Sequence, residues 1–335
     1  MTRELIVHRA GPGVTVQDMG RPGYLGFGLS QGGAADRLAM AEGAALLAQD
    51  GRTAALEMAG MGGEFEASED IRIALTGAPM RAAIDGQRIA WHASHELPKG
   101  ARLVIGGASA GSYGYLHVGG GFDTPETLEA RSAHLAAGLG KAVAAGDVLP
   151  VGEDPGHGTN QCLSVEPRFE GGTVRVVPSL QTDFFGSDQI ARFESAEFHR
   201  DTRGSRMGVR LNGAEGFHSD AGLSVLSEVV VPGDIQITGD GTPFVLLSEC
   251  QTTGGYPRIC TVLPCDLPKV VQAAPGASLR FRFVTLEDAV EAEARAARHR
   301  DSLRAQRQPL VRNPHEMRDL LAYQLISGVT AGNDI

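Results

Sequence analysis

The chain has little of what marks several common protein classes, and each shortage narrows what it can be. Aromatic residues make up only 5% of its 335 residues, and its four cysteines form neither a CxxC pair nor a Cys/His pattern with zinc spacing. A formal net charge of −10 leaves no basic excess for nucleic acid or an anionic membrane. We therefore expect reduced thiols in a cytoplasmic protein, with no metal, nucleic acid or membrane as partner.

Other signatures are missing too. Gly140-Lys141 is followed by Ala142, so the chain has no Walker-type phosphate loop, and no lysine stands in the Met-Lys-Met setting of a biotin acceptor. The N-terminus carries no apolar signal core. The uncharged segment 103–122 is broken by glycines and polar residues, which predicts strand, turn and strand instead of a membrane span. If the reaction needs ATP or biotin, a partner must supply it.

What the chain does have is a pattern of short strands joined by tight turns. Its 45 glycines and short β-branched runs favour many strands. Asp85-Gly86, between two apolar segments, is a strong hairpin signal, and the segment 239–241 marks another turn. These signals recur at regular spacing, which predicts barrels or sandwiches.

Helices are expected at few places. Segment 37–48 is rich in alanine and leucine and follows Asp36, a plausible N-cap. A second helix is expected to start at Asp266, and a charged third over 286–306.

The chain divides into two parts of similar design. Segment 152–158 is rich in Gly, Asp and Pro and is typical of a linker. Two polar, glycine-containing stretches, 18–24 and 251–256, are each followed by an aspartate and a helix-like run, which suggests two related domains. We predict a first β domain over residues 1–165, a second over 166–285, and a helical, loosely ordered C-terminal segment over 286–335, whose apolar part is 320–326.

One polar loop, residues 249–258, organises the second half of the chain. It reads Glu-Cys-Gln-Thr-Thr-Gly-Gly-Tyr-Pro-Arg and lies between strand-like segments 244–247 and 259–263. Its glycines allow unusual backbone angles, and its other residues offer amide, hydroxyl, phenol and guanidinium groups. Such loops often carry a site. The alternative left open by the spacing is a tight β connection whose polar groups bond only to one another.

Several motifs in order resemble the KipA-like family, which includes the C subunit of 5-oxoprolinase and has also been described as allophanate hydrolase subunit 2 or a biotin-dependent carboxyltransferase. The resemblance spans about 7–283 and rests on segments 16–23, 55–57, 75–78, 206–211, 231–236 and 251–257. It implies a mainly β protein with two cyclophilin-like β-barrel domains and a few short helices.

Three positions depart from the pattern that the resemblance implies. Ser205 stands where an acidic residue is usual, and Glu249-Cys250 stands where the family has Asp-Arg. Segment 128–133 reads Leu-Glu-Ala-Arg-Ser-Ala where Leu-Gly-Ser-Arg-Ser-Thr is usual. The departures remove polar groups, including one cation, from the expected site.

The resemblance implies work on a small amide. The leading hypothesis is the C subunit of an ATP-dependent 5-oxoprolinase, which opens the lactam of 5-oxoproline to glutamate together with two partners, a KipI-like protein (the B subunit) and a separate protein (the A subunit). The chain itself would bind no cofactor, and ATP would come through a partner. Two alternatives stay open: the carboxyltransferase component of a biotin-dependent urea or amide carboxylase, and a non-enzymatic regulator that binds a KipI-like protein.

Opening an amide requires a hold on the substrate carboxylate and stabilisation of charge on the carbonyl oxygen. The predicted catalytic residues are Gln251, Thr252, Thr253 and Asp18. The predicted substrate-binding residues are Arg21, Asp36, Arg206, Gln236, Gly254, Gly255, Tyr256 and Arg258. For each arginine, the simpler reading is an ion pair of small value.

Overall fold

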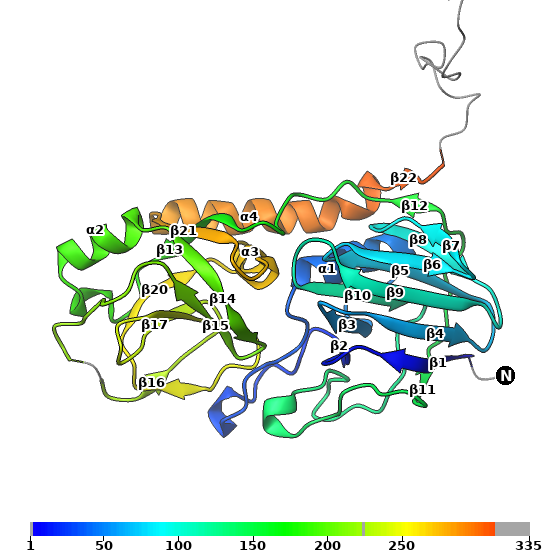
Figure 1. Ribbon diagram of the computed structural model, residues 1–335, viewed down its shortest axis with the longest axis horizontal. Helices are drawn as coiled ribbons and strands as arrows, with labels where there is room; N and C mark the ends of the chain where they lie inside the picture. The colour runs from blue at the N-terminus through cyan, green and yellow to red at the C-terminus, as the bar shows by residue number, and fades with distance from the viewer. Residues whose placement is uncertain (1–2, 223–224, 312–335) are drawn as a thin grey trace, which may run out of the picture.

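The first domain consists of two β-sheets packed face to face (Figure 1). The computed structural model describes residues 3–222 and 225–311, so the apolar segment 320–326 lies outside the described residues. One sheet has the order β11-β1-β4-β9-β6-β7. Its strands are β1 (Arg3–Ala10), β4 (Gly63–Ala67), β6 (Met80–Ile84), β7 (Gln87–Ile89), β9 (Arg102–Ala108) and β11 (Val148–Val151).

The second sheet has the order β2-β3-β10-β5-β8-β12-β22 and joins distant parts of the chain. Its last two strands come from the segment just after the linker and from the segment after the last long helix. The strands are β2 (Thr15–Gln17), β3 (Ala55–Ala59), β5 (Ile71–Gly77), β8 (Ala93–Leu97), β10 (Tyr113–Val118), β12 (Gln161–Cys162) and β22 (Gln308–Pro309).

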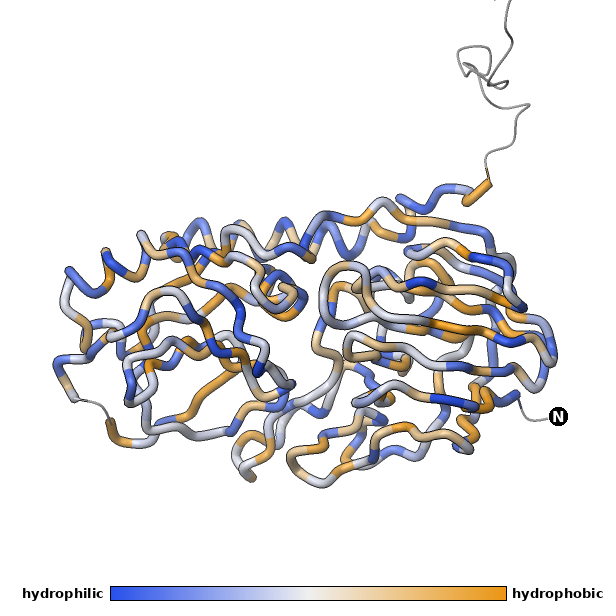
Figure 2. Tube along the Cα trace, viewed as in Figure 1, coloured by the Kyte–Doolittle hydropathy of each residue, from blue (hydrophilic) through white to orange (hydrophobic). Residues whose placement is uncertain are grey.

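A buried apolar core lies between these two sheets. Leu5 and Val7 of β1 point inward in strand alternation and meet Leu75 and Leu116 of the opposite sheet. Hydrophobic residues recur along these strands (Figure 2). The Asp85-Gly86 hairpin is confirmed, because both residues adopt positive φ, 46° and 80°, as a tight two-residue turn requires.

The second domain is a closed seven-stranded barrel of order β13-β20-β17-β18-β15-β14-β21. All neighbours pair antiparallel except β13 and β21, which are parallel. A separate two-stranded ribbon, β16 with β19, lies beside the barrel. The strands are β13 (Gly172–Val177), β14 (Phe198–Ser205), β15 (Gly208–Asn212), β16 (Glu228–Val229), β17 (Asp234–Ile237), β18 (Pro243–Leu246), β19 (Thr253–Gly254), β20 (Arg258–Val262) and β21 (Ser278–Phe283).

Helix α1 (Arg37–Leu47) is confirmed, with the Asp36 side chain accepting hydrogen bonds from Leu38 N and Ala39 N. It packs on the second sheet of the first domain. Gly43 allows this close packing, because a Cβ there would lie 2.2 Å from Nε2 of the buried His117. Helix α3 (Leu267–Gln272) begins after Asp266 as expected, but the Asp266 carboxylate binds Arg175 instead of capping the helix.

Helix α2 (Ser187–Ser195) was not predicted from the sequence. It carries only two large apolar residues, Ile190 and Phe193, so its periodicity is weak. Its anchor is tertiary: Phe193 is buried in the second domain, with ring centroids 5.1 Å from Phe198 and 5.3 Å from Phe281.

The predicted helix over 286–306 is confirmed as α4 (Leu286–Ser302) followed by a 3-10 turn, η4 (Leu303–Gln306). Figure 1 shows α4 running along one side of the molecule past both domains. Ala289 and Ala292 are buried beside Leu263 of the second domain, and Leu303 is buried in a cluster with α1. Three further 3-10 turns are η1 (Leu25–Phe27), η2 (Leu135–Ala137) and η3 (Thr182–Phe184).

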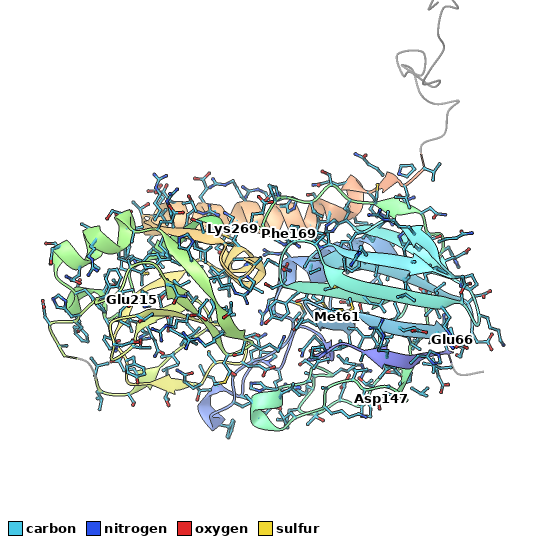
Figure 3. The ribbon with its side chains drawn as sticks, viewed as in Figure 1. Met61, Glu66, Asp147, Phe169, Glu215 and Lys269 are labelled. Atoms are coloured by element: carbon cyan, nitrogen blue, oxygen red, sulfur yellow. The ribbon has the colours of Figure 1, made fainter. Side chains whose placement is uncertain are left out.

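The mainly β prediction is confirmed. The two domains share a continuous boundary, because one apolar cluster contains Met40 and Tyr115 of the first domain together with Val209 and Ile259 of the second. Phe169, labelled at this junction in Figure 3, stacks at 6.0 Å on His92 of the first domain. None of the helices in the described part of the chain is long and apolar enough to cross a membrane.

Candidate functional site

The turn between β14 and β15 carries Arg206 across the domain boundary. Its Nε donates to Glu249 Oε1 at 2.6 Å, its Nη1 donates to Glu57 of β3, and its Nη2 donates to the carbonyl oxygen of Gly33. The Tyr115 hydroxyl donates to the other Glu57 oxygen at 2.7 Å. We call Glu57, Tyr115, Arg206 and Glu249 the Arg206 cluster.

The Arg206 cluster is buried and electrically matched. The side chains of Glu57, Glu249 and Arg206 are 1%, 4% and 11% exposed. Burial alone lowers the pKa of Arg206, but the two carboxylates outweigh it and raise that pKa overall. All three guanidinium nitrogens are bonded to protein, so in this structure Arg206 joins the domains and has no donor nitrogen left over for a substrate.

Asp36 lies in a second buried network. One carboxylate oxygen caps α1, and the other accepts from Arg168 Nε at 2.9 Å and from Gln272 Nε2 of α3 at 2.8 Å. Arg168 in turn forms a bidentate pair with Glu42 at 2.7 and 2.8 Å. Both oxygens of Asp36 therefore have protein partners that join α1, the segment around Arg168 and α3.

Arg21 differs from these residues because part of its guanidinium is unpaired. The side chain is 1% exposed, and its Nε and Nη2 donate to the carbonyl oxygens of Thr127 and Ser132. Its Nη1 has no hydrogen-bond partner among the described residues, and no carboxylate lies within ion-pair distance there. Burial lowers the pKa of Arg21, although Asp18 and Glu249 oppose the shift. Arg21 is thus a buried cation with an unused donor.

Asp18 holds the loop that carries Arg21. Its carboxylate accepts from the backbone N–H of Gly20 at 2.8 Å and from that of Arg131 at 2.6 Å. It also lines a cavity of about 420 Å³ together with Asp123, Glu126 and Arg131.

His134 and Ser30 lie beside Glu249, which suggests a nucleophile, base and acid at first sight. Ser30 Oγ is 2.8 Å from His134 Nε2, whereas Glu249 is 3.9 Å from His134 Nδ1, too far for a hydrogen bond. His134 Nδ1 instead accepts from the backbone N–H of Ala137. This assigns the proton to Nε2, which donates to Ser30 Oγ, so the ring cannot take the serine proton. Burial lowers the pKa of His134, which keeps the ring neutral.

The Gln251 loop, residues 251–258, presents polar side chains to solvent. Gln251, Thr253 and Tyr256 are exposed, and Gln251 Nε2 donates to Gln236 Oε1 at 3.3 Å. Gln236 is 3% exposed, and its Nε2 has no partner in the described structure. A Cβ at Gly254 would lie 2.4 Å from that nitrogen, so the glycine is required for this approach.

The backbone of the Gln251 loop is fixed from below. Strand β19 pairs with β16, and the carbonyl oxygen of Thr252 accepts from Val230 N. Arg258 is 6% exposed and donates to Glu228 Oε2 at 2.5 Å and to the Val229 carbonyl oxygen at 2.9 Å. In this structure Arg258 therefore supports the loop from behind, while the exposed side chains of the loop are amides, hydroxyls and a phenol.

Cys250 and Ser109 are both candidates for a nucleophile by residue type, and the structure argues against that role for each. Cys250 is buried, and burial raises the pKa of its thiol to about 12, so it is not a thiolate nucleophile at neutral pH. Segment 107–111, Gly-Ala-Ser-Ala-Gly, matches the Gly-x-Ser-x-Gly pattern of a nucleophile elbow. Ser109 lies in the turn between β9 and β10, not between a strand and a helix, and donates to the Pro79 carbonyl oxygen.

The structure thus separates the predicted residues into two groups. Arg206, Asp36 and Arg258 are bonded within the fold, while Gln251, Thr253 and the loop glycines lie at the surface with the buried Gln236 beneath them. Sequence reasoning did not assign roles to Glu57, Glu249, Tyr115 or His134, because their partners are far along the chain. Within residues 3–222 and 225–311, no three His, Cys, Asp or Glu side chains gather as metal ligands.

The chain is similar to known proteins over most of its length. Residues 27–283 match the family described as "Carboxyltransferase domain, subdomain A and B". The chain is 30% identical over 294 residues to the C subunit of 5-oxoprolinase from Haemophilus influenzae, covering 87% of this chain and 94% of that protein. It is 28% identical over 297 residues to "Urea amidolyase" of Saccharomyces cerevisiae, covering 81% of this chain and 16% of that protein.

A solved structure shares the fold. The crystal structure of the K. lactis urea amidolyase superposes with a TM-score of 0.79 at 22% identity, covering 93% of this chain and 21% of that chain. At this identity the likeness concerns the fold.

Proposed function

Because the chain belongs to the family of the carboxyltransferase domain, subdomains A and B, we propose that it is the C subunit of an ATP-dependent 5-oxoprolinase. The observation that carries the proposal is the match to a 5-oxoprolinase C subunit, which spans 94% of that protein. The reaction would be the opening of the 5-oxoproline lactam to glutamate, in a complex with a KipI-like B subunit plus an A subunit.

The exposed side chains of the Gln251 loop suit one half of this chemistry. A lactam carbonyl gains negative charge as its amide resonance is broken, and fixed donors aimed at that oxygen lower the barrier. The donors of this loop are the Gln251 amide and the hydroxyls of Thr252 and Thr253. Beneath them, the buried Nε2 of Gln236 has no partner in the described structure and adds a further donor. Tyr256 offers an exposed ring against which a small cyclic substrate can pack.

Arg21 suits the other requirement, which is to hold the substrate carboxylate. Its unused Nη1 is a cationic donor that could hold a carboxylate, and its charge lacks a counterion within ion-pair distance among the described residues. Arg21 is buried, and a Cβ at Gly32 would lie 3.7 Å from Nη1 but only 3.1 Å from Cδ2 of His134, so a carboxylate would reach Nη1 only if this loop shifts. Asp18 would act by holding the Arg21 loop.

The proposal assigns ATP to the partners. No residue of this chain is given a role in binding ATP, and its own contribution is to orient the lactam and stabilise the carbonyl oxygen. The activity of the isolated chain is accordingly expected to be undetectable.

The test is ATP-dependent release of glutamate from 5-oxoproline by the chain reconstituted with the A and B subunits. We expect turnover only when all three proteins, ATP and 5-oxoproline are present. An intact three-protein complex that hydrolyses ATP but releases no glutamate would reject the lactam as substrate.

A second candidate is the carboxyltransferase component of a biotin-dependent urea or amide carboxylase. The observation in its favour is the 28% identity to the yeast urea amidolyase over 81% of this chain. In that case carboxybiotin, carried by another chain, would approach the Gln251 loop. Replacing 5-oxoproline by urea in the same reconstitution, with a biotin carboxylase, a biotinylated carrier and bicarbonate added, separates the two candidates: only one substrate should stimulate ATP hydrolysis.

A further inference from the structure

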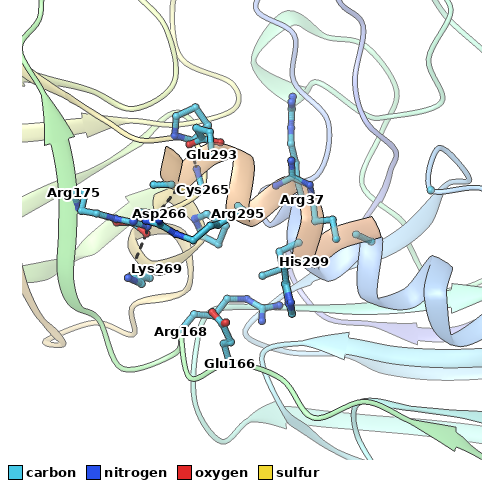
Figure 4. Close-up of a pocket in the computed structure, with 18 of the residues that line it drawn as sticks. Arg37, Glu166, Arg168, Arg175, Cys265, Asp266, Lys269, Glu293, Arg295 and His299 are labelled. Carbon is cyan, nitrogen blue, oxygen red and sulfur yellow. Dashed lines mark hydrogen bonds and ion pairs between the residues drawn. The ribbon is translucent and has the colours of Figure 1, made fainter. Parts of the chain in front are cut away.

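A cavity of about 690 Å³ lies between α1, residues 166–168, α3 with its preceding turn, and α4 (Figure 4). We call it the α4 cavity. None of the residues predicted for the amide site lines it. It is bounded by both domains, because α1 belongs to the first and α3 to the second.

The lining of the α4 cavity is cationic although the chain as a whole is acidic. Seven arginine or lysine side chains and His299 line it, against three acidic side chains, whereas the whole chain carries a formal charge of −10. Such a local concentration of positive charge attracts anions.

Several of these cations already have partners. Arg175 and Lys269 lie 2.7 and 3.3 Å from Asp266, and the dashed lines in Figure 4 mark their bonds. Arg168 is paired with Asp36 and Glu42, and Arg52 with Asp50. Arg295 also lines the cavity, and its pair with Glu291 is weak because both side chains are more than half exposed, 52% and 64%.

Arg37 and Arg300 are different. Neither side chain has an ion pair or hydrogen bond with any described residue. Both side chains are exposed to solvent, although partial desolvation by the surrounding protein lowers the pKa of Arg37. Because neither arginine has a counterion among the described residues, both guanidiniums can pair with an anion that enters the cavity.

The cavity can also accept the body of a ligand. Arg295 and His299 are four residues apart on α4 and so share one face of the helix, as do Ala296 and Arg300. This face therefore presents small side chains beside the charged ones. Leu38 and Ala41 of α1 add an apolar patch. Figure 4 shows Arg37 and His299 on one side of the cavity and Arg175 with Asp266 on the other.

We propose that the α4 cavity binds a small anion with at least two negative charges, of the phosphate or polycarboxylate type, through Arg37, Arg300 and Arg295. The ligand would bridge the first domain and α4. Its binding would therefore stabilise the arrangement of the two domains. The proposal is independent of the amide chemistry at the Gln251 loop.

The experiment is a calorimetric titration of the full chain with sodium pyrophosphate and, separately, with citrate, each against sodium chloride at equal ionic strength. We expect saturable binding of one ion per chain and a rise in Tm with ligand concentration. The ratio of the two affinities distinguishes a phosphate site from a polycarboxylate site. No saturable heat and no shift in Tm with either probe would overturn the proposal.

Matched variants locate the binding. Arg37→Gln and Arg300→Gln should each weaken the tighter probe roughly tenfold, since each removes a charged donor. Arg298→Gln is the control, because Arg298 lies exposed on the same helix, carries the same charge and does not line the cavity. Equal weakening by all three variants would reveal a general effect of charge and would overturn the site. Unchanged circular dichroism shows that each variant is folded.

Discussion

The Arg206 cluster and the Gln251 loop lie two residues apart in the chain, at Glu249 and Gln251, yet they use their polar groups in opposite ways. Arg206 meets two buried carboxylates and a carbonyl oxygen, so each of its nitrogens has a partner. Two residues beyond Glu249, Gln251 is exposed and has one long hydrogen bond to Gln236, whose own amide nitrogen has none among the described residues. Matched groups hold the domains together, and unmatched groups remain available to a substrate.

The difference teaches how to sort polar residues that a motif places together. A guanidinium in a shared motif can be a substrate anchor or a structural tie, and only its partners decide. Arg206 and Arg258 have carboxylate partners, whereas Arg21 has an unused nitrogen. The following predictions test that division.

The largest effect is expected from breaking the Arg206 cluster. Arg206→Met leaves Glu57 and Glu249 buried without their cation, which should lower the free energy of unfolding by about 3–5 kcal/mol. Arg203→Met is the matched control on β14, because its ion pair with Asp201 has a 73% exposed arginine and should matter little. Urea unfolding followed by circular dichroism measures both. Equal losses in the two variants would contradict a structural role specific to Arg206.

The second prediction concerns a buried histidine, His117, whose protonation depends on pH. The exposed amides and hydroxyls of the loop do not titrate. Burial lowers the pKa of His117 from 6.5 to about 3, so the folded protein keeps this ring neutral. Its contribution to stability is complete above pH 6.5 and is lost as pH falls toward 3. At pH 5 the loss is about 2 kcal/mol for this residue.

His117→Asn should flatten the dependence of the unfolding free energy on pH between 6.5 and about 4, whatever its effect at neutral pH. The slope that remains should come from other buried histidines such as His92, whose pKa burial lowers to about 4. Urea unfolding at several pH values gives the slope. An unchanged slope would show that His117 titrates normally in the folded protein.

Within the loop, Thr253→Val removes one exposed hydroxyl and keeps the shape of the side chain. If that hydroxyl donates to the lactam oxygen, kcat should fall about tenfold while the urea midpoint stays the same. The β19–β16 pairing uses only the Thr253 backbone, so the strand should be unaffected. A fall in stability without a specific fall in kcat would place Thr253 with the structural residues.

An effect on KM instead of kcat is expected at Arg21. Arg21→Lys keeps the charge but loses the planar fork, so KM for 5-oxoproline should rise roughly tenfold with kcat nearly unchanged. Steady-state kinetics of the reconstituted complex give both constants. The kinetic split decides the role: a fall in kcat at constant KM would mean that Arg21 does not anchor the substrate.

Short-range signals in the sequence predict much of the fold. Asp36 before an alanine- and leucine-rich run predicts α1, and Asp85-Gly86 predicts a hairpin, because each depends on residues within a few positions. Helix α2 was not predicted, since its anchor Phe193 packs on Phe281, 88 residues later in a chain of 335. Asp266 marks the start of α3, but its carboxylate has a partner 91 residues away, Arg175.

The same distinction explains the site. The Gln251 loop is recognisable because its glycines, amide and hydroxyls are adjacent in sequence. The partner of Arg206 at Glu57 is 149 residues away, so its structural role cannot be derived from a single sequence. The α4 cavity is lined by seven separate segments of the chain, and no local pattern marks it.

The most direct test of the account replaces Gln251 by Ala in the chain reconstituted with the A and B subunits, with Gln87→Ala on an exposed hairpin strand as control. Glutamate release and the urea midpoint are measured on the same preparations. We predict that Gln251→Ala lowers kcat by roughly 100-fold or more with an unchanged midpoint, while Gln87→Ala changes neither. Wild-type turnover by Gln251→Ala, or a loss that only follows its stability, would contradict the assignment of the Gln251 loop to the active site.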